Sequence, residues 1–171
     1  PVPMAIMGAK IEFFDIALGD VVKGKNYEVT LASQNHPNKS YAFRVDCEGE
    51  SIVFATDTEH YEDKIDENLL ELSRGADFLI YDSQYTADEY YGLNGQMSRK
   101  TWGHSTAEEG LKLAKEAGVE NFVLFHHDPT HNDEFICRLE KEAKEVFPNS
   151  IAAYEGLEIE VGKPLPDSLF A

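Results

Sequence analysis

Cysteine and long apolar runs are both scarce in this sequence. Its 171 residues include two cysteines, Cys47 and Cys137, which lie far apart and outside any C-x-x-C pattern. Two isolated cysteines are typical of a reducing compartment and favour buried thiols over a disulfide, so we predict a cytoplasmic protein. No apolar run approaches the length of a transmembrane helix and no signal peptide is visible, so we predict no membrane partner.

Basic residues are also few. The chain has 15 Lys and Arg against 32 Asp and Glu, which gives a formal net charge of -17. Such a field repels phosphate backbones, and the sequence shows no local basic groove that would overcome it. We therefore expect nucleic acid not to be a partner.

The length and composition fit one soluble domain. Apolar residues make up 42% of the chain and charged residues 27%. With no linker or internal repeat, we predict a single domain over residues 1–171, ending in a Pro-rich tail from about residue 162. The first residues, Pro1 to Met4, are unlike a natural start and suggest a chain that begins partway through a longer protein.

The order of apolar runs predicts hairpins first and β-α-β units later. Strands are predicted at residues 10–14, 27–32, 41–45, 51–55, 77–82, 121–125, 150–154 and 157–161. Helices are predicted at residues 66–75, 105–118 and 132–146, the second opening with a capping box of Ser105 and Glu108. The polar loop at 91–102 is a candidate lid. The pattern indicates an α/β fold with a mixed sheet and helices on one face.

Three of the apolar strands end in a possible ligand: Asp57, Asp82 and His126. In open α/β sheets, ligands bind at the carboxyl ends of the strands. Together with the loop residue His36, Asp57 and His126 could bind zinc, with manganese and iron as alternatives. A pair of cations bridged by Asp57 would lower the pKa of a bound water and hold a phosphoryl or acyl oxygen.

His104 lies just before a predicted helix, where it could orient a substrate or protonate a leaving group. Structural alternatives remain open for the whole set. A histidine at a strand end is often only hydrogen-bonded, and Asp57 could cap a turn. Asp82 could hold loops together. His60 is interpreted as a solvated loop residue, as is His131, although His131 is close enough in sequence to contact a substrate.

Several segments resemble the motifs of one known family. They are Asn35 to Pro37, Ala55 to His60, Gly103 to Thr106 and Leu124 to Pro129. In this order they are similar to the later motifs of the metallo-β-lactamase fold, in the branch with tRNase Z and a cyclic phosphodiesterase of phosphonate metabolism. The resemblance runs from about Ala9 to Val161, almost the entire chain.

The resemblance implies roles by position. His36 would bind the first metal and His126 the second, with Asp57 bridging both. His104 matches the histidine of the family's H-S-T loop. Asp82 matches the acid of the H-E-A-T motif of tRNase Z, but Tyr81 stands where that motif has its histidine.

The family's H-x-H-x-D-H motif has no counterpart in this chain. The resemblance therefore implies the C-terminal half of a four-layer αββα sandwich, with an exposed sheet face. Such a half would hold one cation or none where the complete site holds two. It would pair with a second copy or with the missing half.

The function implied is a metal-dependent hydrolase that cleaves phosphodiester bonds in a small or cyclic substrate, with the isolated chain incomplete and inactive. Asp57 and His104 would be catalytic, and His104, Asp82 and His131 would contact the substrate. A non-catalytic interaction or sensing module is the alternative, supported by the absent motif. A nuclease resembling tRNase Z ranks third, because Tyr81 and the acidic charge argue against it.

Overall fold

A computed structural model describes residue 6 and residues 8–168. The strands are β1 (Val21–Lys23), β2 (Tyr27–Gln34), β3 (Ser40–Cys47), β4 (Glu50–Ala55), β5 (Phe78–Asp82), β6 (Asn121–Phe125) and β7 (Ser150–Ala152). The helices are α1 (Glu67–Ser73), α2 (Ala87–Tyr91), α3 (Ala107–Ala117) and α4 (Asp133–Val146). No helix in this described part is both long and apolar enough to cross a bilayer.

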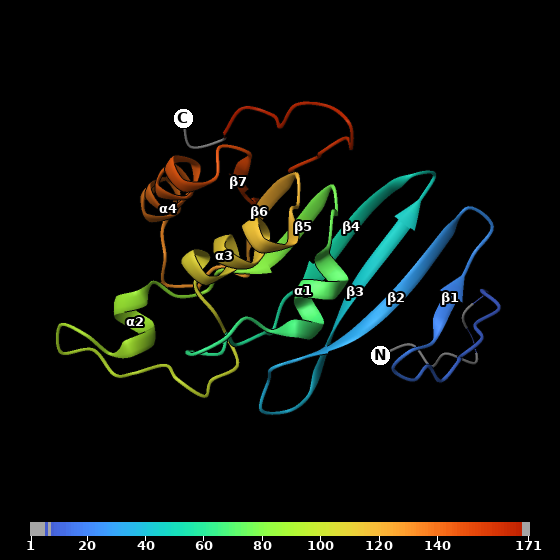
Figure 1. Cartoon of the computed structure of the whole chain (residues 1–171), viewed down its shortest axis with the longest axis horizontal. Helices are drawn as coiled ribbons and strands as arrows, with labels where there is room; N and C mark the ends of the chain where they lie inside the picture. Colours follow the sequence, from blue (N-terminus) through green and yellow to red (C-terminus); the bar gives the residue numbers. More distant parts are fainter. Residues whose placement is uncertain (1–5, 7, 169–171) are drawn as a thin grey trace.

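The strands form one seven-stranded sheet in which each strand lies beside its neighbour in the sequence. β1 to β4 pair antiparallel, and β4 to β7 pair parallel. Parallel neighbours need long crossovers, and here α1, α3 and α4 supply them. Figure 1 shows these three helices on one face of the sheet. The predicted mixed sheet with helices on one face is confirmed.

The main core lies between this face and the helices. β4 alternates buried and exposed residues, with Val53 and Ala55 fully buried. Helix α3 packs directly against the sheet at Gly110, where an added Cβ would lie 2.4 Å from Tyr81 Cδ1 and 2.7 Å from Phe122 Cζ. A glycine at this position therefore sets the distance between α3 and the strands that lead to the site.

The opposite face of the sheet is apolar and only partly covered. The segment after β7 lies over β5 and β6 and encloses a groove of about 280 Å³. Further along the sheet, Tyr41, Phe43 and Phe54 are 46%, 37% and 39% exposed. The family resemblance implies an exposed sheet face, and these partly exposed aromatic side chains lie on such a face.

Two predicted strands are wrong. Residues 10–14 and 157–161 are irregular and pair with no strand of the described chain. Residues of the second segment still pack their apolar side chains, among them Leu157 and Ile159, on the sheet face. The alternation of apolar residues in this segment therefore arises because one side of it is buried, although it makes no strand-pairing hydrogen bonds.

Two helices also differ from the prediction: α3 begins at a different residue, and α2 was not predicted. α3 begins one residue late, because Thr106 is the N-cap and its hydroxyl accepts from the Glu109 amide. Ser105 is fully buried, and its hydroxyl bonds with Tyr81 and His60 instead. α2 was not predicted, although Thr86 and Glu89 form a complete capping box at its start.

Candidate metal centre

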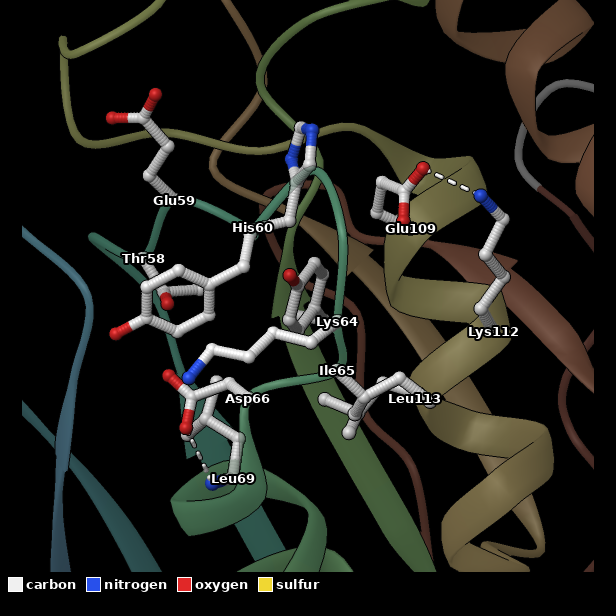
Figure 2. A pocket seen from close by; sticks show the side chains of 12 residues that line it. Thr58, Glu59, His60, Lys64, Ile65, Asp66, Leu69, Glu109, Lys112 and Leu113 are labelled. Carbon is white, nitrogen blue, oxygen red and sulfur yellow. Dashed lines mark hydrogen bonds and ion pairs between the residues drawn. The ribbon is translucent and has the colours of Figure 1, made fainter.

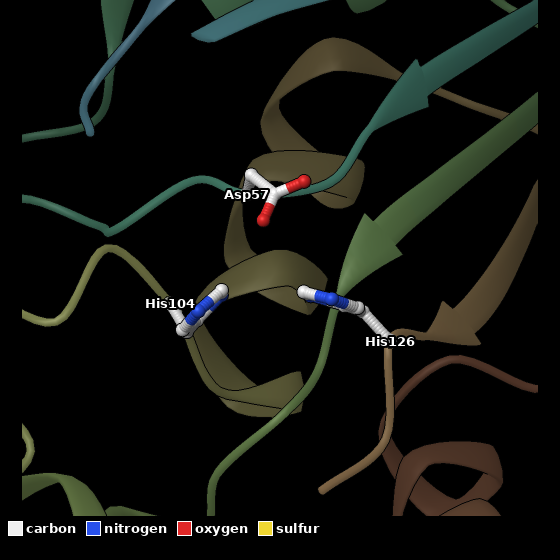
Figure 3. Close-up of side chains that lie close together, drawn as sticks. All are labelled: Asp57, His104 and His126. Carbon is white, nitrogen blue, oxygen red and sulfur yellow. The ribbon is translucent and has the colours of Figure 1, made fainter. Parts of the chain in front are cut away.

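The candidate site lies where the parallel strands end. Asp57 follows β4, Asp82 ends β5 and His126 follows β6, while His104 precedes α3. One possible ligand atom from each of Asp57, His104 and His126 lies within 4.8 Å of the others. Figure 3 shows the three side chains pointing toward one another. The sheet therefore brings together residues that are up to 69 positions apart in the sequence.

Asp82 organises this cluster from beneath. Its side chain is fully buried, and its Oδ2 atom lies 3.0 Å from Nδ1 of His104 and 3.1 Å from Nδ1 of His126. The same oxygen accepts from the Asp57 amide at 2.9 Å, and Oδ1 accepts from the Ser105 amide at 3.3 Å. One carboxylate thus holds all three members of the cluster. Its burial leaves no surface for a substrate to touch.

The charge on Asp82 is stabilised where it lies. Burial raises the pKa of its carboxyl group, but hydrogen bonds from His104 and His126 outweigh burial and hold that pKa below its ordinary value. In return, the hydrogen bond to Asp82 raises the pKa of His126, against the opposing effect of burial. Because Nδ1 of each imidazole serves Asp82, Nε2 is the nitrogen left to meet a cation.

The backbone is strained at two members of the cluster. Asp57 has φ 56° and His126 has φ 63°, in the left-handed region that non-glycine residues seldom adopt. Such conformations cost about 1–3 kcal/mol each and persist only where neighbours hold them. Around Asp57, its carbonyl accepts from Ser40 Oγ at 2.7 Å and from Gln34 Nε2 at 3.1 Å. Strain compensated in this way is typical of functional sites.

His36 lies beside the cluster, outside the group of ligand atoms within 4.8 Å of one another. Its ring centroid is 6.1 Å from that of His104. Gly103 allows this approach, because an added Cβ there would lie 2.2 Å from His36 Cδ2. The structure thus places His104 with Asp57 and His126, where the sequence analysis placed His36, and the role of His36 as a ligand stays a prediction.

His131 lies away from the cluster. Its Nε2 atom is 2.9 Å from Glu89 Oε1, and its ring stacks on Phe135 with centroids 3.9 Å apart. Its proposed contact with a substrate stays a prediction.

His60 was expected to be solvated, and this is wrong. It is 9% exposed, and its Nδ1 lies 2.8 Å from Ser105 Oγ, which also accepts from the Tyr81 hydroxyl at 3.1 Å. Burial lowers the pKa of His60, so the ring is held neutral. The loop after Asp57 therefore folds inward, under the start of α3.

His60 and Tyr81 also line a small pocket on the helix side, shown in Figure 2. The Glu109 and Lys112 ion pair, at 2.6 Å, lies at its edge. Its volume of about 30 Å³ admits only about two or three water molecules. This pocket is too small to bind a substrate.

Glu59 shapes the loop beside the site, a role that the sequence analysis missed. It is 7% exposed, and its carboxylate accepts from the Tyr90 hydroxyl at 2.7 Å, the Thr101 amide at 2.7 Å and the Gly103 amide at 3.0 Å. These bonds fix the loop that carries His104. A glutamate in a polar loop gives no signal of this role in a single sequence.

The donor set fits a divalent cation. One carboxylate and two imidazoles suit zinc, manganese or iron. Metal-binding histidines almost always donate their second ring N–H to a carboxylate or carbonyl, and Asp82 supplies that acceptor to both rings. The orientation of these side chains is therefore that of ligands.

Comparison with known proteins shows the family and the fold of this chain. Residues 5–127 match the family model of the beta-lactamase superfamily domain. A ribonuclease Z of Bacillus subtilis is 31% identical over 137 residues, which cover 80% of this chain and 41% of that protein. A ribonuclease Z of Methanosarcina acetivorans is 38% identical over 113 residues, covering 66% and 33%.

Solved structures share the fold. The metallo-beta-lactamase fold protein YhfI of Bacillus subtilis has a TM-score of 0.63 at 23% identity, covering 80% of this chain and 50% of that one. Zn(2+)-bound PqqB of Methylobacterium extorquens has a TM-score of 0.66 at 15% identity, covering 85% and 54%. The chain thus spans about half the length of these structures, and less than half of either ribonuclease.

The relatives correct one prediction. We expected a small phosphoester as partner and not nucleic acid, and we ranked a nuclease third, but sequence relatives are named ribonuclease Z. The expectation that nucleic acid is not a partner rested on the net charge of -17. A net charge sums the charges of the whole chain and does not describe the electrostatic field at one edge of the sheet. The matched residues and the shared fold show that this chain belongs to the beta-lactamase superfamily, with the metallo-β-lactamase fold.

Proposed function

We propose that this chain contributes to the active site of a metal-dependent ribonuclease that hydrolyses phosphodiester bonds in RNA. The observation that carries the proposal is the convergence of Asp57, His104 and His126 within 4.8 Å, with Asp82 behind both histidines. The choice of RNA is supported by relatives named ribonuclease Z. Because those proteins are more than twice as long as the matched region, the proposal concerns the residues that this chain supplies.

Asp57, His104 and His126 would hold the cation, for which zinc suits the mixed nitrogen and oxygen ligands. When bound, such a cation polarises a phosphoryl oxygen and lowers the pKa of water. Asp82 keeps both imidazoles in the tautomer with Nε2 free and fixes their orientation. His36, whose ring lies 6.1 Å from that of His104, would take part where a second cation binds.

His104 has two competing roles. The sequence favoured assistance to the leaving group. Its Nδ1 atom, however, is engaged with Asp82, and its ring centroid lies 4.9 Å from that of His126, which favours a ligand role. We therefore assign His104 to the cation.

Cleavage of end-labelled RNA tests this function in a protein that joins this chain to the N-terminal half of a ribonuclease Z relative, because the isolated chain is expected to be inactive. We expect cleavage with zinc or manganese, none with a chelator, and a loss of at least about 100-fold in Asp57→Asn, because a carboxylate ligand is removed. The matched control is Asp63→Asn, the same change at an exposed loop carboxylate. Cleavage that persists in Asp57→Asn would contradict the proposal, as would a metal-loaded joined protein that cleaves no RNA.

A further inference from the structure

An exposed aromatic ring stands next to the candidate centre. Trp102 is the only tryptophan in the sequence, and it is 48% exposed two residues before His104. Its ring lies 5.3 Å from Cζ of Arg99, and the same guanidinium lies 5.1 Å from the ring of Tyr85. The Tyr85 ring in turn lies 5.9 Å from that of His104. A continuous row of contacts therefore joins Trp102 to the centre.

The backbone under this ring is fixed. The amides of Thr101 and Gly103, on either side of Trp102, both donate to the carboxylate of Glu59. The Trp102 amide donates to the Arg99 carbonyl at 3.2 Å. An aromatic side chain on a pre-ordered backbone loses little freedom when a ligand binds. The exposed position of Trp102 is therefore built into the loop and is not a result of loose packing.

Arg99 is incompletely satisfied. Its Nη1 makes one long contact, at 3.4 Å, with Asp128 Oδ2, while the other oxygen of Asp128 accepts from both the amide and the hydroxyl of Thr130. Its buried Nε atom has no hydrogen-bond partner among the described residues, and the side chain is 27% exposed. Arg99 thus places a partly exposed positive charge beside the centre of a strongly acidic chain.

We propose that Trp102 and Arg99 form a subsite for one unpaired nucleotide of an RNA strand, in which the base stacks on Trp102 and Arg99 donates to a neighbouring phosphate. The choice of RNA rests on the proposed function. Proteins bind single-stranded nucleic acid by pairing exposed aromatic rings with cations along the backbone. The row from Trp102 to His104 places this nucleotide next to the bond to be cleaved.

The single tryptophan allows a direct test without substitution. The chain is titrated in excess chelator with single-stranded hexa-adenylate RNA while the fluorescence of Trp102 is recorded. Because a stacked base quenches the indole, we expect saturable quenching. Ribose 5-phosphate, which offers a phosphate without a base, should give none. Quenching of equal size by ribose 5-phosphate would overturn the stacking.

Variants give a second readout, by anisotropy of a labelled hexa-adenylate. Loss of stacking in Trp102→Ala should weaken binding roughly 5- to 150-fold, and Trp102→Phe should recover most of it. Met97→Ala, a change to an exposed apolar residue of the same loop, is the matched control.

Arg99→Gln should lower the slope of log affinity against log salt by about 0.7, the value for one phosphate contact to a single strand. Lys115→Gln, which removes an exposed charge on α3, should leave this slope unchanged.

The outcomes separate this subsite from the proposed function. RNA that binds by anisotropy without quenching Trp102, and equally well to Trp102→Ala, would overturn the subsite and leave the ribonuclease function standing. Base-dependent quenching in this chain, together with no cleavage by the metal-loaded protein that joins it to the N-terminal half of a ribonuclease Z relative, would support the subsite and overturn the function. Self-association that Trp102→Ala abolishes, with no binding of RNA, would identify a protein interface and overturn the subsite.

Discussion

Asp82→Asn is the substitution that bears most directly on how the centre is built. In the native chain, Oδ2 of Asp82 accepts from the Asp57 amide and from Nδ1 of both His104 and His126, at 2.9–3.1 Å. Oδ1 accepts from the Ser105 amide. An asparagine has one oxygen and one NH2 group in place of the two carboxylate oxygens. Its NH2 group must therefore face either the donors that bond to Oδ2 in the native chain or the donor that bonds to Oδ1.

The cost can be worked out from these contacts. The less damaging choice keeps the amide oxygen toward the histidines and turns NH2 toward the amides of Ser105 and Gln84, each 3.3 Å from Oδ1. Leaving two buried donors unpaired costs about 1–3 kcal/mol each, and the bonds to the histidines lose their charge. We expect a loss of about 3 kcal/mol in the free energy of unfolding, which corresponds to a Tm about 6–12 °C lower for a domain of this size.

The affinity for zinc should fall as well. Removing the acceptor behind metal-binding histidines costs roughly 10- to 100-fold in affinity. Asp77→Asn is the matched control, because Asp77 precedes the same strand at its other end and accepts from the amide and hydroxyl of Ser51. Calorimetric zinc titration and thermal unfolding of both variants give the comparison. Native zinc affinity in Asp82→Asn, or an equal loss in Asp77→Asn, would refute the reasoning.

Two further predictions concern the surroundings of the cluster. Gly103→Ala puts a Cβ 2.2 Å from the His36 ring at φ 91°, whereas Gly49→Ala at φ 94° meets nothing within 4 Å. Thermal unfolding should therefore show a larger loss in Gly103→Ala, and equal losses would contradict the close approach. Because the pKa of His126 is raised in the fold, protonation of His126 stabilises the metal-free chain. This stabilisation is fully present below the ordinary pKa of 6.5, and it is lost as pH rises through the raised pKa. Urea unfolding in chelator between about pH 6 and pH 8 should show this decline in the native chain but not in His126→Gln, and the same decline in both would contradict it.

The sequence predicted the edge of the sheet where the site lies. Asp57, Asp82 and His126 each follow a visible apolar strand, and parallel pairing brings such strand ends together. The sequence did not predict that Asp82 is buried beneath the cluster. A role for this residue in holding loops together by hydrogen bonds was one of the alternatives left open. A strand pattern places a residue at an edge but does not show which way its side chain faces.

The loops could not be predicted in the same way. His104, rather than His36, joins the cluster because Glu59 and Gly103 shape the segment before α3, and neither residue has a local sequence pattern that signals this. The start of α3 was misplaced by one residue because the hydroxyl of Ser105 bonds with tertiary partners instead of capping the helix. Charge failed as a guide to partners, since a net value averages over a surface on which Arg99 lies beside the site.

The most direct test of the account is zinc binding by the chelator-treated chain, measured by equilibrium dialysis or calorimetry. The convergence of Asp57, His104 and His126 predicts at least one zinc ion bound per native chain. Asp57→Ala and His126→Gln should each weaken binding at least about tenfold, while Asp63→Ala, at an exposed carboxylate, should bind as the native chain does. A native chain that binds no zinc, or an Asp57→Ala chain that binds it with native affinity, would contradict the assignment of this cluster as a metal centre.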